Sequence, residues 1–310
     1  MNIALIFPGQ GSQYIGMGQD FFNDSAESRS IFKHLDEIMG KNLTELMFNG
    51  SEDELAKTTN SQPAIMSVSI AILKEIFVRG LLDEKKIHSV AGHSLGEYSA
   101  LVANNSLSFE DSVKLLIIRS EAMQKSMPLG TGGMAAVLGQ SEEEILIIIQ
   151  KLKKYGKLFI ANDNADGQIV LSGEINAIDY LCANAKTLGA KRAIKLPVSA
   201  PFHCELINDA SVTLKKEIEK FNFDKFSYPL YSNVTAEKSD RMDIKTMLSK
   251  QIINKVRWRE TMQNMIRDNV ETFIEIGPGN VLTNLLKRSS KEIKSVSIGK
   301  LSDLDKLEDI

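Results

Sequence analysis

The chain is poor in cysteine, with only Cys182 and Cys204 in 310 residues. Two thiols cannot form the dense disulfide framework of a small secreted domain, and they fit a reducing compartment better. The N-terminus, MNIALIFPGQ, lacks the basic start and the small-residue cleavage site of a signal peptide. The most apolar stretch, PAIMSVSIAIL, is well short of the roughly 20 residues that a membrane span requires. We therefore expect a cytoplasmic protein that does not associate with a membrane.

An excess of charge of either sign is also missing. Lys and Arg total 37 and Asp and Glu total 40, which leaves a net charge of -3 at pH 7. Because a nucleic-acid binder carries a strongly basic face, we expect no binding to nucleic acid. With 43% hydrophobic and 25% charged residues, the composition is that of an ordinary globular protein. The length allows one large domain or two of moderate size.

Apolar strands alternate with helices in the first part of the chain and again near its end. IALIF (3–7) is a short apolar run closed by the breaker PGQG, and it predicts a buried strand. HSVAG (88–92) and the first half of ETFIEIGPGN (271–280) predict similar strands, each followed by a glycine-containing turn and a helix. This order predicts an α/β core with a mostly parallel sheet. Further helices are predicted over 62–80, from about Gly96, and over 109–127.

The pattern changes after PLGTGG (128–133), where strands and helices follow in the order β-α-β-β-α-β. That order is typical of a ferredoxin-like unit. We therefore expect a small ferredoxin-like subdomain, 128–196, inserted into a large α/β-hydrolase-like subdomain made of 1–127 and 197–310. The predicted segments of the insert are strand 134–139, helix 141–156, strands 157–162 and 168–173, helix 175–189 and strand 190–197.

One motif predicts a nucleophile. Gly92-His93-Ser94-Leu95-Gly96 matches G-x-S-x-G between a predicted strand and a predicted helix. In that setting the glycines allow a sharp turn that lifts the serine hydroxyl above the sheet, where backbone N–H groups can face a developing oxyanion. The alternative is a serine that only caps a helix. The strand before and the helix after favour a catalytic Ser94.

A serine nucleophile needs a base, and the chain has four histidines. His34 lies in a charged helical segment, His88 precedes a strand, and His93 adjoins the serine on a turn where neighbouring side chains point apart. His203 lies in LPVSAPFHCEL, where the predicted insert returns to the large subdomain, and active sites concentrate at such seams. Elimination thus favours His203. Cys204 has no such turn, and we expect it to be a buried structural thiol.

A catalytic triad would add an acid that orients the histidine. Between the serine and the histidine the candidates are Asp163, Asp166 and Asp179, all in the predicted insert. None of them stands at the end of a predicted strand. The sequence therefore favours a Ser–His dyad.

Arg119 lies on the predicted helix 109–127 without an acid at helical spacing. Its neighbours one turn away are Leu115, Leu116, Ala122 and Met123. A guanidinium on an apolar face requires a partner from elsewhere in the fold. Two readings stay open: a structural ion pair with a distant acid, or a two-point site for a substrate carboxylate.

Seven motifs follow one another along nearly the whole chain: FPGQGSQYIGMG (7–18), GHSLGEYSALVA (92–103), RSEAMQ (119–124), GGMAAVLG (132–139), ANDNADGQIVLSG (161–173), LPVSAPFHC (196–204) and EIGPGNVLTNLLKR (275–288). Their order and combination resemble those of the malonyl-CoA:acyl-carrier-protein transacylases of dissociated (type II) fatty-acid synthesis. No single motif is specific, but together they are.

The resemblance implies an acyltransferase with a ping-pong mechanism. Ser94 resembles the nucleophile that becomes acylated and His203 its base, while a main-chain carbonyl at the position of Gln251 takes the place of a triad acid. The backbone N–H groups of Gln10 and Leu95 resemble the oxyanion hole.

The resemblance also implies an acyl pocket that selects malonyl. Arg119 resembles the residue that binds the free carboxylate, and Met123 and Phe202 fall where the family lines the pocket. Asp163 departs from many relatives, which carry an aromatic residue there. The implied substrates are malonyl-CoA and holo-acyl-carrier protein, with no cofactor and no metal, and we expect a monomer.

Three other functions remain open at this point. A thioesterase or esterase uses the same turn, but the missing triad acid and the lone Arg119 count against it. A catalytically silent module that only docks a carrier protein is disfavoured by the intact Ser94 and His203. An acyltransferase of a polyketide pathway fits the same residues.

Overall fold

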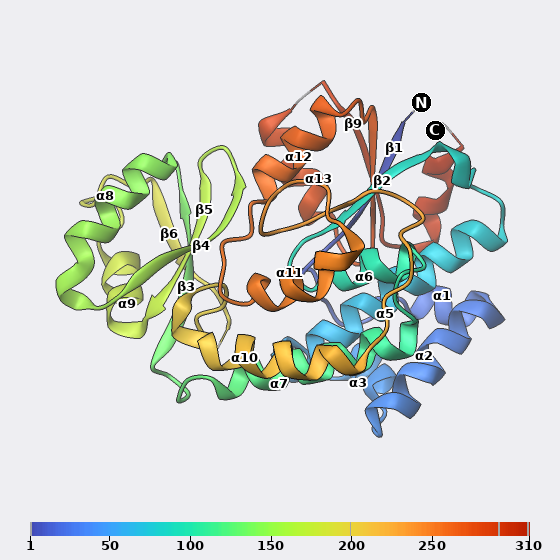
Figure 1. Cartoon of the computed structure of the whole chain (residues 1–310), viewed down its shortest axis with the longest axis horizontal. Coiled ribbons are helices and arrows are strands. Elements are labelled where there is room, and N and C mark those ends of the chain that lie inside the picture. The colour runs from blue at the N-terminus through green and yellow to red at the C-terminus, as the bar shows by residue number, and fades with distance from the viewer. Residues whose placement is uncertain (1, 199, 291, 309) are drawn as a thin grey trace.

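The computed structural model describes residues 2–198, 200–290, 292–308 and 310. A five-stranded sheet forms the centre of the larger part, in the order β7-β2-β1-β8-β9, and all its pairings are parallel (Figure 1). This confirms the predicted α/β fold with a parallel sheet. The strands are β1 (Ile3–Phe7), β2 (Ile87–Gly92), β7 (Leu230–Tyr231), β8 (Thr272–Ile276) and β9 (Lys294–Ile298).

β1 lies in the middle of this sheet and is buried on both faces, as its unbroken apolar sequence requires. Successive side chains of a strand point to opposite faces. Ile3, Leu5 and Phe7 join the apolar cluster of α2, α5 and α7, whereas Ala4 and Ile6 join that of α12 and α13. The helices of the large part are α1 (Gln19–Asp24), α2 (Ala26–Met39), α3 (Leu43–Asn49), α4 (Glu52–Ala56), α5 (Thr58–Val78), α6 (Gly96–Ala103), α7 (Phe109–Lys125), α10 (Asn208–Glu217), α11 (Ile244–Gln251), α12 (Trp258–Arg267) and α13 (Val281–Ser289).

The central helix α5 is long and apolar enough to cross a membrane by length and composition alone. However, 83% of the apolar window is buried inside the fold, where α5 packs against α2 and α7. It is therefore a core helix, apolar all round because it is enclosed all round. It begins at Thr58, four residues before the predicted start, and Pro63 lies inside the helix, in its second turn.

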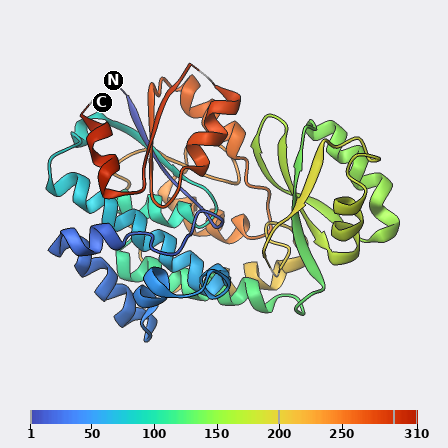
Figure 2. The same cartoon turned by 180° about the vertical axis from the view of Figure 1, so that it is seen from behind.

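The smaller part is a four-stranded sheet in the order β4-β5-β3-β6, with every pairing antiparallel. Helices α8 (Glu142–Leu152) and α9 (Ile175–Ala183) cover its outer face, away from the large sheet (Figures 1 and 2). This is the predicted ferredoxin-like arrangement. The division of the chain at 127/128 and 196/197 stays a prediction. The strands are β3 (Gly132–Leu138), β4 (Leu158–Ala165), β5 (Gln168–Glu174) and β6 (Arg192–Lys195).

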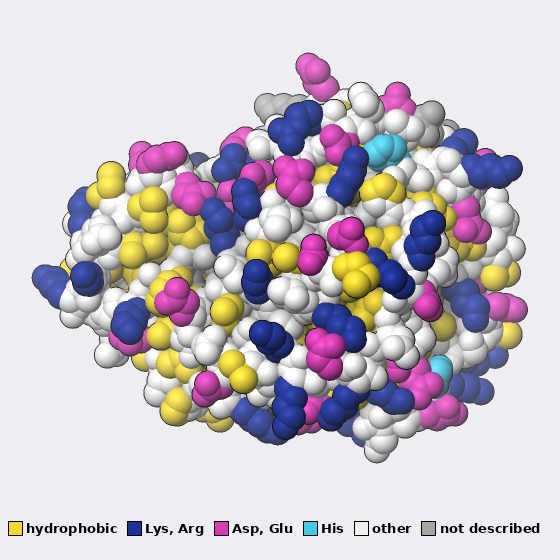
Figure 3. Space-filling view, viewed as in Figure 1, with side chains coloured by type: hydrophobic (Ala, Val, Ile, Leu, Met, Phe, Trp, Pro, Cys, Tyr) yellow, Lys and Arg dark blue, Asp and Glu magenta, His cyan; other side chains and the backbone are white. Residues whose placement is uncertain are grey.

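Main-chain hydrogen bonds join the small sheet to the large part. The N–H of Val256 donates to the carbonyl of Ala161 at 2.8 Å, and the N–H of Asp163 donates to the carbonyl of Val256 at 2.9 Å. Arg259 then pairs with the buried carboxylate of Asp163 at 2.7 Å. These contacts hold the two sheets on either side of the loops that follow β1 and β2. On the face seen in Figure 3, acidic and basic side chains are interspersed.

Candidate active site

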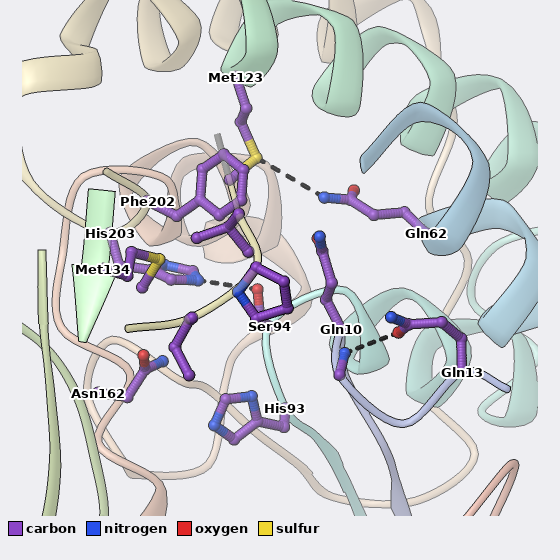
Figure 4. A pocket seen from close by; sticks show the side chains of 14 residues that line it. Gln10, Gln13, Gln62, His93, Ser94, Met123, Met134, Asn162, Phe202 and His203 are labelled. Carbon is purple, nitrogen blue, oxygen red and sulfur yellow. Dashed lines mark hydrogen bonds between the residues drawn. The ribbon is translucent and has the colours of Figure 1, made fainter. Parts of the chain in front are cut away.

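Ser94 lies on a tight turn between β2 and α6 and has a left-handed backbone with φ of 54°. The flanking glycines allow that turn. A Cβ on Gly92 would lie 1.9 Å from the carbonyl of Gly96, and a Cβ on Gly96 would lie 2.2 Å from the carbonyl oxygen of Phe7. Leu95, not Ser94, is the N-cap of α6, and that cap has no side-chain hydrogen bond. Ser94 is thus free of a capping role, and its hydroxyl points into the cavity (Figure 4).

His203 comes from the returning segment and lies against the nucleophile. Its Nε2 is 2.8 Å from the Oγ of Ser94, and its Nδ1 is 2.8 Å from the main-chain oxygen of Gln251. Because a carbonyl only accepts, Nδ1 carries the proton and Nε2 is left as the acceptor for the serine hydroxyl. Burial, and then the charge of Arg119, lowers the pKa of His203 to about 3. The ring is therefore neutral at neutral pH, in the form that a base requires.

His93 is positioned otherwise. Its Nε2 is 2.8 Å from the Oδ1 of Asn164, and its ring packs edge-on against Trp258. Burial lowers its pKa. The ring also lines the active-site cavity, but the geometry gives it no contact with the serine hydroxyl among the hydrogen bonds of the described residues. This agrees with the structural role predicted for it.

The other candidates from the sequence are committed elsewhere. Asp163 pairs with Arg259, with Asp166 at the edge of that pair, and Asp179 pairs with Lys195. In the part of the chain that the structure describes, none of the three hydrogen-bonds to the histidine. Cys204 is buried and donates to the carbonyl of Pro201, and burial raises the pKa of its thiol to about 12. A neutral thiol of this kind is not a nucleophile at neutral pH.

Arg119 is fully buried and reaches the nucleophile from α7. Its Nη1 donates to the Oε1 of Gln62 at 2.7 Å, and its Nη2 donates both to the Oγ of Ser94 and to the Oε1 of Gln251, each at 2.9 Å. The guanidinium carbon lies 5.6 Å from the ring centre of Tyr98. Across the described ranges no carboxylate lies within ion-pair distance of it. All its acceptors are neutral, so Arg119 has no partner for a structural ion pair among the described residues.

The helix that carries Arg119 is locally well determined. The side chain of Ser108 caps its start by accepting from the N–H of Asp111 at 3.0 Å. From there Leu115, Leu116 and Met123 share the buried face with the arginine. The 3.6-residue period therefore turns a long cation inward among apolar neighbours.

Two backbone N–H groups border the serine. That of Leu95 opens α6, and that of Gln10 lies in the loop after β1, which contacts the turn so closely that a Cβ on Gly9 would be 2.6 Å from the carbonyl oxygen of His93. Neither N–H has an acceptor among the residues that the structure describes. Gln10 lies beside Ser94 in Figure 4. Unpaired donors next to a nucleophile are suited to bind an oxyanion.

A cavity of about 140 Å³ opens in front of the serine, between the two sheets (Figure 4). Met123 and Phe202 line it together with Met134 and Asn162 of the small sheet, and their role in binding the acyl group stays a prediction. Within the described ranges no cluster of three or more His, Cys, Asp or Glu side chains is placed to bind a metal.

The polar residues of the site that were not predicted include Gln62, Glu97 and Asn233. The Oδ1 of Asn233 accepts from the N–H of Ser94 at 2.7 Å, while its Nδ2 donates to the carbonyl of Gly92 at 2.7 Å. Asn233 thus holds both sides of the turn. The only local signal for any of them is a polar residue in an apolar context, as in NSQPA and GEYSA.

A serine and a neutral histidine on such a turn, beside free N–H donors, are typical of enzymes that move acyl groups through a serine ester. The comparisons agree. The family described as "Acyl transferase domain" matches residues 4–304. The malonyl CoA-acyl carrier protein transacylase of Bacillus subtilis is 41% identical over 96% of this chain and 93% of its own length. The chain therefore belongs to the malonyl CoA-acyl carrier protein transacylases and is an acyltransferase.

Solved structures give the same result. The acyl-carrier-protein S-malonyltransferase from Bartonella henselae superposes with a TM-score of 0.94 at 41% identity, covering 99% of this chain and 98% of that one. A malonyl-transacylase solved in complex with its holo type II PKS acyl-carrier protein superposes with a TM-score of 0.95 at 34% identity, with both chains fully covered.

Proposed function

We propose that the chain transfers the malonyl group from malonyl-CoA to the phosphopantetheine thiol of acyl-carrier protein for fatty-acid synthesis. One observation carries the proposal: the Oγ of Ser94 contacts a neutral base, His203, and a buried cation, Arg119, at the same time. A hydrolase needs only the base. An enzyme that must recognise an acyl group with a free carboxylate also needs the cation.

In the first half-reaction His203 takes the proton of the Ser94 hydroxyl through Nε2, and Oγ attacks the thioester carbonyl. The N–H groups of Gln10 and Leu95 stabilise the oxyanion. The carbon–sulfur bond then breaks, and the CoA sulfur takes the proton back from the histidine. The main-chain oxygen of Gln251 holds the ring in the required tautomer and supports the transient imidazolium.

The second half-reaction runs the same steps in reverse with a different thiol. The phosphopantetheine thiol gives its proton to His203 and attacks the carbonyl of the malonyl ester on Ser94. The oxyanion is bound by the same two N–H groups. Collapse breaks the ester bond, Oγ recovers its proton from the histidine, and malonyl leaves as the thioester of the carrier protein.

Arg119 reads the free carboxylate. Its Nη1 and Nη2 donate only to neutral oxygens, those of Gln62, Gln251 and Ser94, and its buried Nε has no partner among the described residues. A malonyl carboxylate supplies the missing negative charge in a two-point contact, which an acetyl group cannot. Met123 and Phe202 limit the apolar part of the cavity.

Each of these steps is assigned to side chains and backbone groups of one chain, so we propose no cofactor beyond the two substrates and a monomer as the active form. The carrier protein as partner is supported by the relative that was solved with its own acyl-carrier protein. The cytoplasm is the compartment where the chain would act, and nucleic acid and membranes are not among its proposed partners.

A second candidate is the same transfer to the carrier protein of a polyketide pathway. This candidate is supported by the relative that was solved with a type II PKS carrier protein and is 34% identical over the full length. Rates with purified carrier proteins of both pathways distinguish the two candidates.

The test is the intact mass of the protein mixed with malonyl-CoA, before and after addition of holo-acyl-carrier protein. We expect a malonyl adduct on wild type, its loss on addition of carrier protein, and no adduct on Ser94→Ala. An adduct that persists in Ser94→Ala, or one located on Cys204, contradicts the proposal. An adduct that disappears in buffer as fast as with carrier protein indicates a hydrolase.

A further inference from the structure

Glu97 follows the nucleophile by three residues, donates its backbone N–H to the carbonyl of Ser94 at 3.1 Å, and has no part in the steps above. It is the second residue of α6 and only 1% exposed. Its Oε2 accepts from the side-chain Nε2 of Gln251 at 2.6 Å and from the backbone N–H of Asn233 at 3.4 Å. Its Oε1 has no partner among the described residues. A buried carboxylate without an ion pair is costly, so its presence needs a reason.

The side-chain amide of Gln251 connects the carboxylate of Glu97 to the guanidinium of Arg119. Its Nε2 donates to Glu97 and to the main-chain oxygen of Ser94 at 3.0 Å, and its Oε1 accepts from Nη2 of Arg119 at 2.9 Å. One amide thus lies between a buried anion and a buried cation, and it also contacts the backbone of the nucleophile.

The two charges determine which way the amide points. A carboxylate only accepts hydrogen bonds and a guanidinium only donates them. The amide satisfies both only with its nitrogen toward Glu97 and its oxygen toward Arg119, which is the arrangement observed. If the amide were reversed, its NH₂ group would face the guanidinium and its oxygen would face the carboxylate. Hydrogen bonds to charged groups are the stronger ones, so the preference is substantial.

We propose that Glu97 is a positioning residue for malonyl recognition: it fixes the orientation of the Gln251 amide, whose oxygen holds the guanidinium of Arg119 in place for the free carboxylate of the acyl group. The inference rests on the proposed function, because it assumes that this carboxylate binds Arg119.

The charge on Glu97 is essential to this role. Burial raises the pKa of Glu97 to about 7, against the opposing effects of the hydrogen bonds from Gln251 and Asn233 and of the charge of Arg119. Tyr98, the next residue on the same helix, is a further titratable group near it, and burial raises the pKa of Tyr98 above its ordinary range. Once protonated, the carboxyl can donate as well as accept, and it no longer selects one orientation of the amide.

The test compares wild type with Glu97→Gln at about pH 8, using kcat/KM for malonyl-CoA and for acetyl-CoA. Glutamine keeps the size but can donate or accept, so the amide loses its fixed orientation. We expect kcat/KM for malonyl-CoA to fall about tenfold, the effect of one charge-assisted hydrogen bond. We expect kcat/KM for acetyl-CoA to fall less than about threefold. An equal fall for both thioesters, or no fall, overturns the proposal.

Glu75→Gln is the matched control. Glu75 is also buried, on α5, and it is paired with Arg79 at 2.7 Å outside the active site. Its neutralisation should change the stability of the fold and leave the ratio of kcat/KM for malonyl-CoA to kcat/KM for acetyl-CoA unchanged. A change in that ratio as large as in Glu97→Gln would show that loss of any buried carboxylate has the effect, which also overturns the proposal.

A pH series on wild type tests the proposal even where Glu97→Gln fails to fold. The ratio of malonyl to acetyl values should fall as the pH drops below about 7, while His203, with its pKa of about 3, stays neutral. A ratio that is constant from about pH 8.5 to about pH 5.5 overturns the proposal. The two proposals fail separately: absence of a malonyl adduct on wild type rejects the proposed function, whereas a normal adduct with a constant ratio rejects only the role of Glu97.

Discussion

The Nη2 of Arg119 lies 2.9 Å from the Oγ of Ser94, so the buried cation contacts the nucleophile itself. The same nitrogen donates to the side chain of Gln251. A substrate carboxylate that binds this guanidinium therefore lies close to the reacting oxygen, because the same side chain contacts both. Recognition of the acyl group and attack on its carbonyl depend on one small set of contacts.

Arg119→Ala should reverse the acyl preference. Loss of one partner of a desolvated charge pair costs about 2–5 kcal/mol, which is about 30-fold to several-thousand-fold in kcat/KM for malonyl-CoA. Acetyl-CoA lacks the carboxylate and should lose little. The measurement is kcat/KM for both thioesters, with folding checked by circular dichroism. Arg79→Ala, which removes an arginine from a structural ion pair with Glu75, is the control and should change neither value. Equal losses for both substrates in folded Arg119→Ala would assign the arginine a structural role.

His203→Ala should slow formation of the malonyl adduct by about two to four orders of magnitude, the usual effect of losing a positioned base. His93→Ala should retain the adduct and lose stability, because that ring packs against Trp258 and bonds to Asn164. Rapid-quench mass spectrometry measures the adduct, and thermal unfolding measures the stability. The assignment fails if a folded His93→Ala lacks the adduct while His203→Ala forms it at the normal rate.

Asn233→Ala should weaken the turn that presents the nucleophile. The substitution removes the acceptor of the Ser94 N–H and the donor to the Gly92 carbonyl, both buried. We expect the free energy of unfolding to fall by about 1–3 kcal/mol, with slower adduct formation. Asn284→Ala, at an exposed position on α13, should alter neither quantity. Unchanged stability and rate in Asn233→Ala would show that the glycines alone maintain the turn.

Glu97→Gln should become relatively more stable as the pH rises. The pKa of Glu97 is about 7 in the folded chain and 4.5 ordinarily, so the folded state holds this proton more tightly. The resulting stabilisation is present below about pH 4.5 and is lost as the pH rises through 7. Glutamine has no such loss. Between about pH 4.5 and 8 the variant should therefore gain about 3 kcal/mol on wild type. Urea unfolding at both ends of the range measures this. A difference that is independent of pH would contradict the raised pKa.

The sequence by itself determined the features that depend on neighbours in the chain. The strand IALIF, the turn at Ser94 and the β-α-β-β-α-β order follow from local periodicity and from glycines at short spacing, and the structure confirms the predicted fold. Helical spacing also showed that Arg119 has no acid one turn away. Strand β7, with two residues, is too short for a period to reveal it.

Only the tertiary structure decided how these features meet. Arg119 bonds to Gln62 and Gln251, which are 57 and 132 residues away in the chain, and Asn233 binds a serine 139 residues before it. Glu97 faces Gln251 across 154 positions. Such partners leave no period in the sequence, because a hydrogen bond depends on distance and direction in the packed fold and not on separation along the chain. The nucleophile could therefore be predicted from the sequence. The polar network that orients the residues around it could be identified only from the tertiary structure.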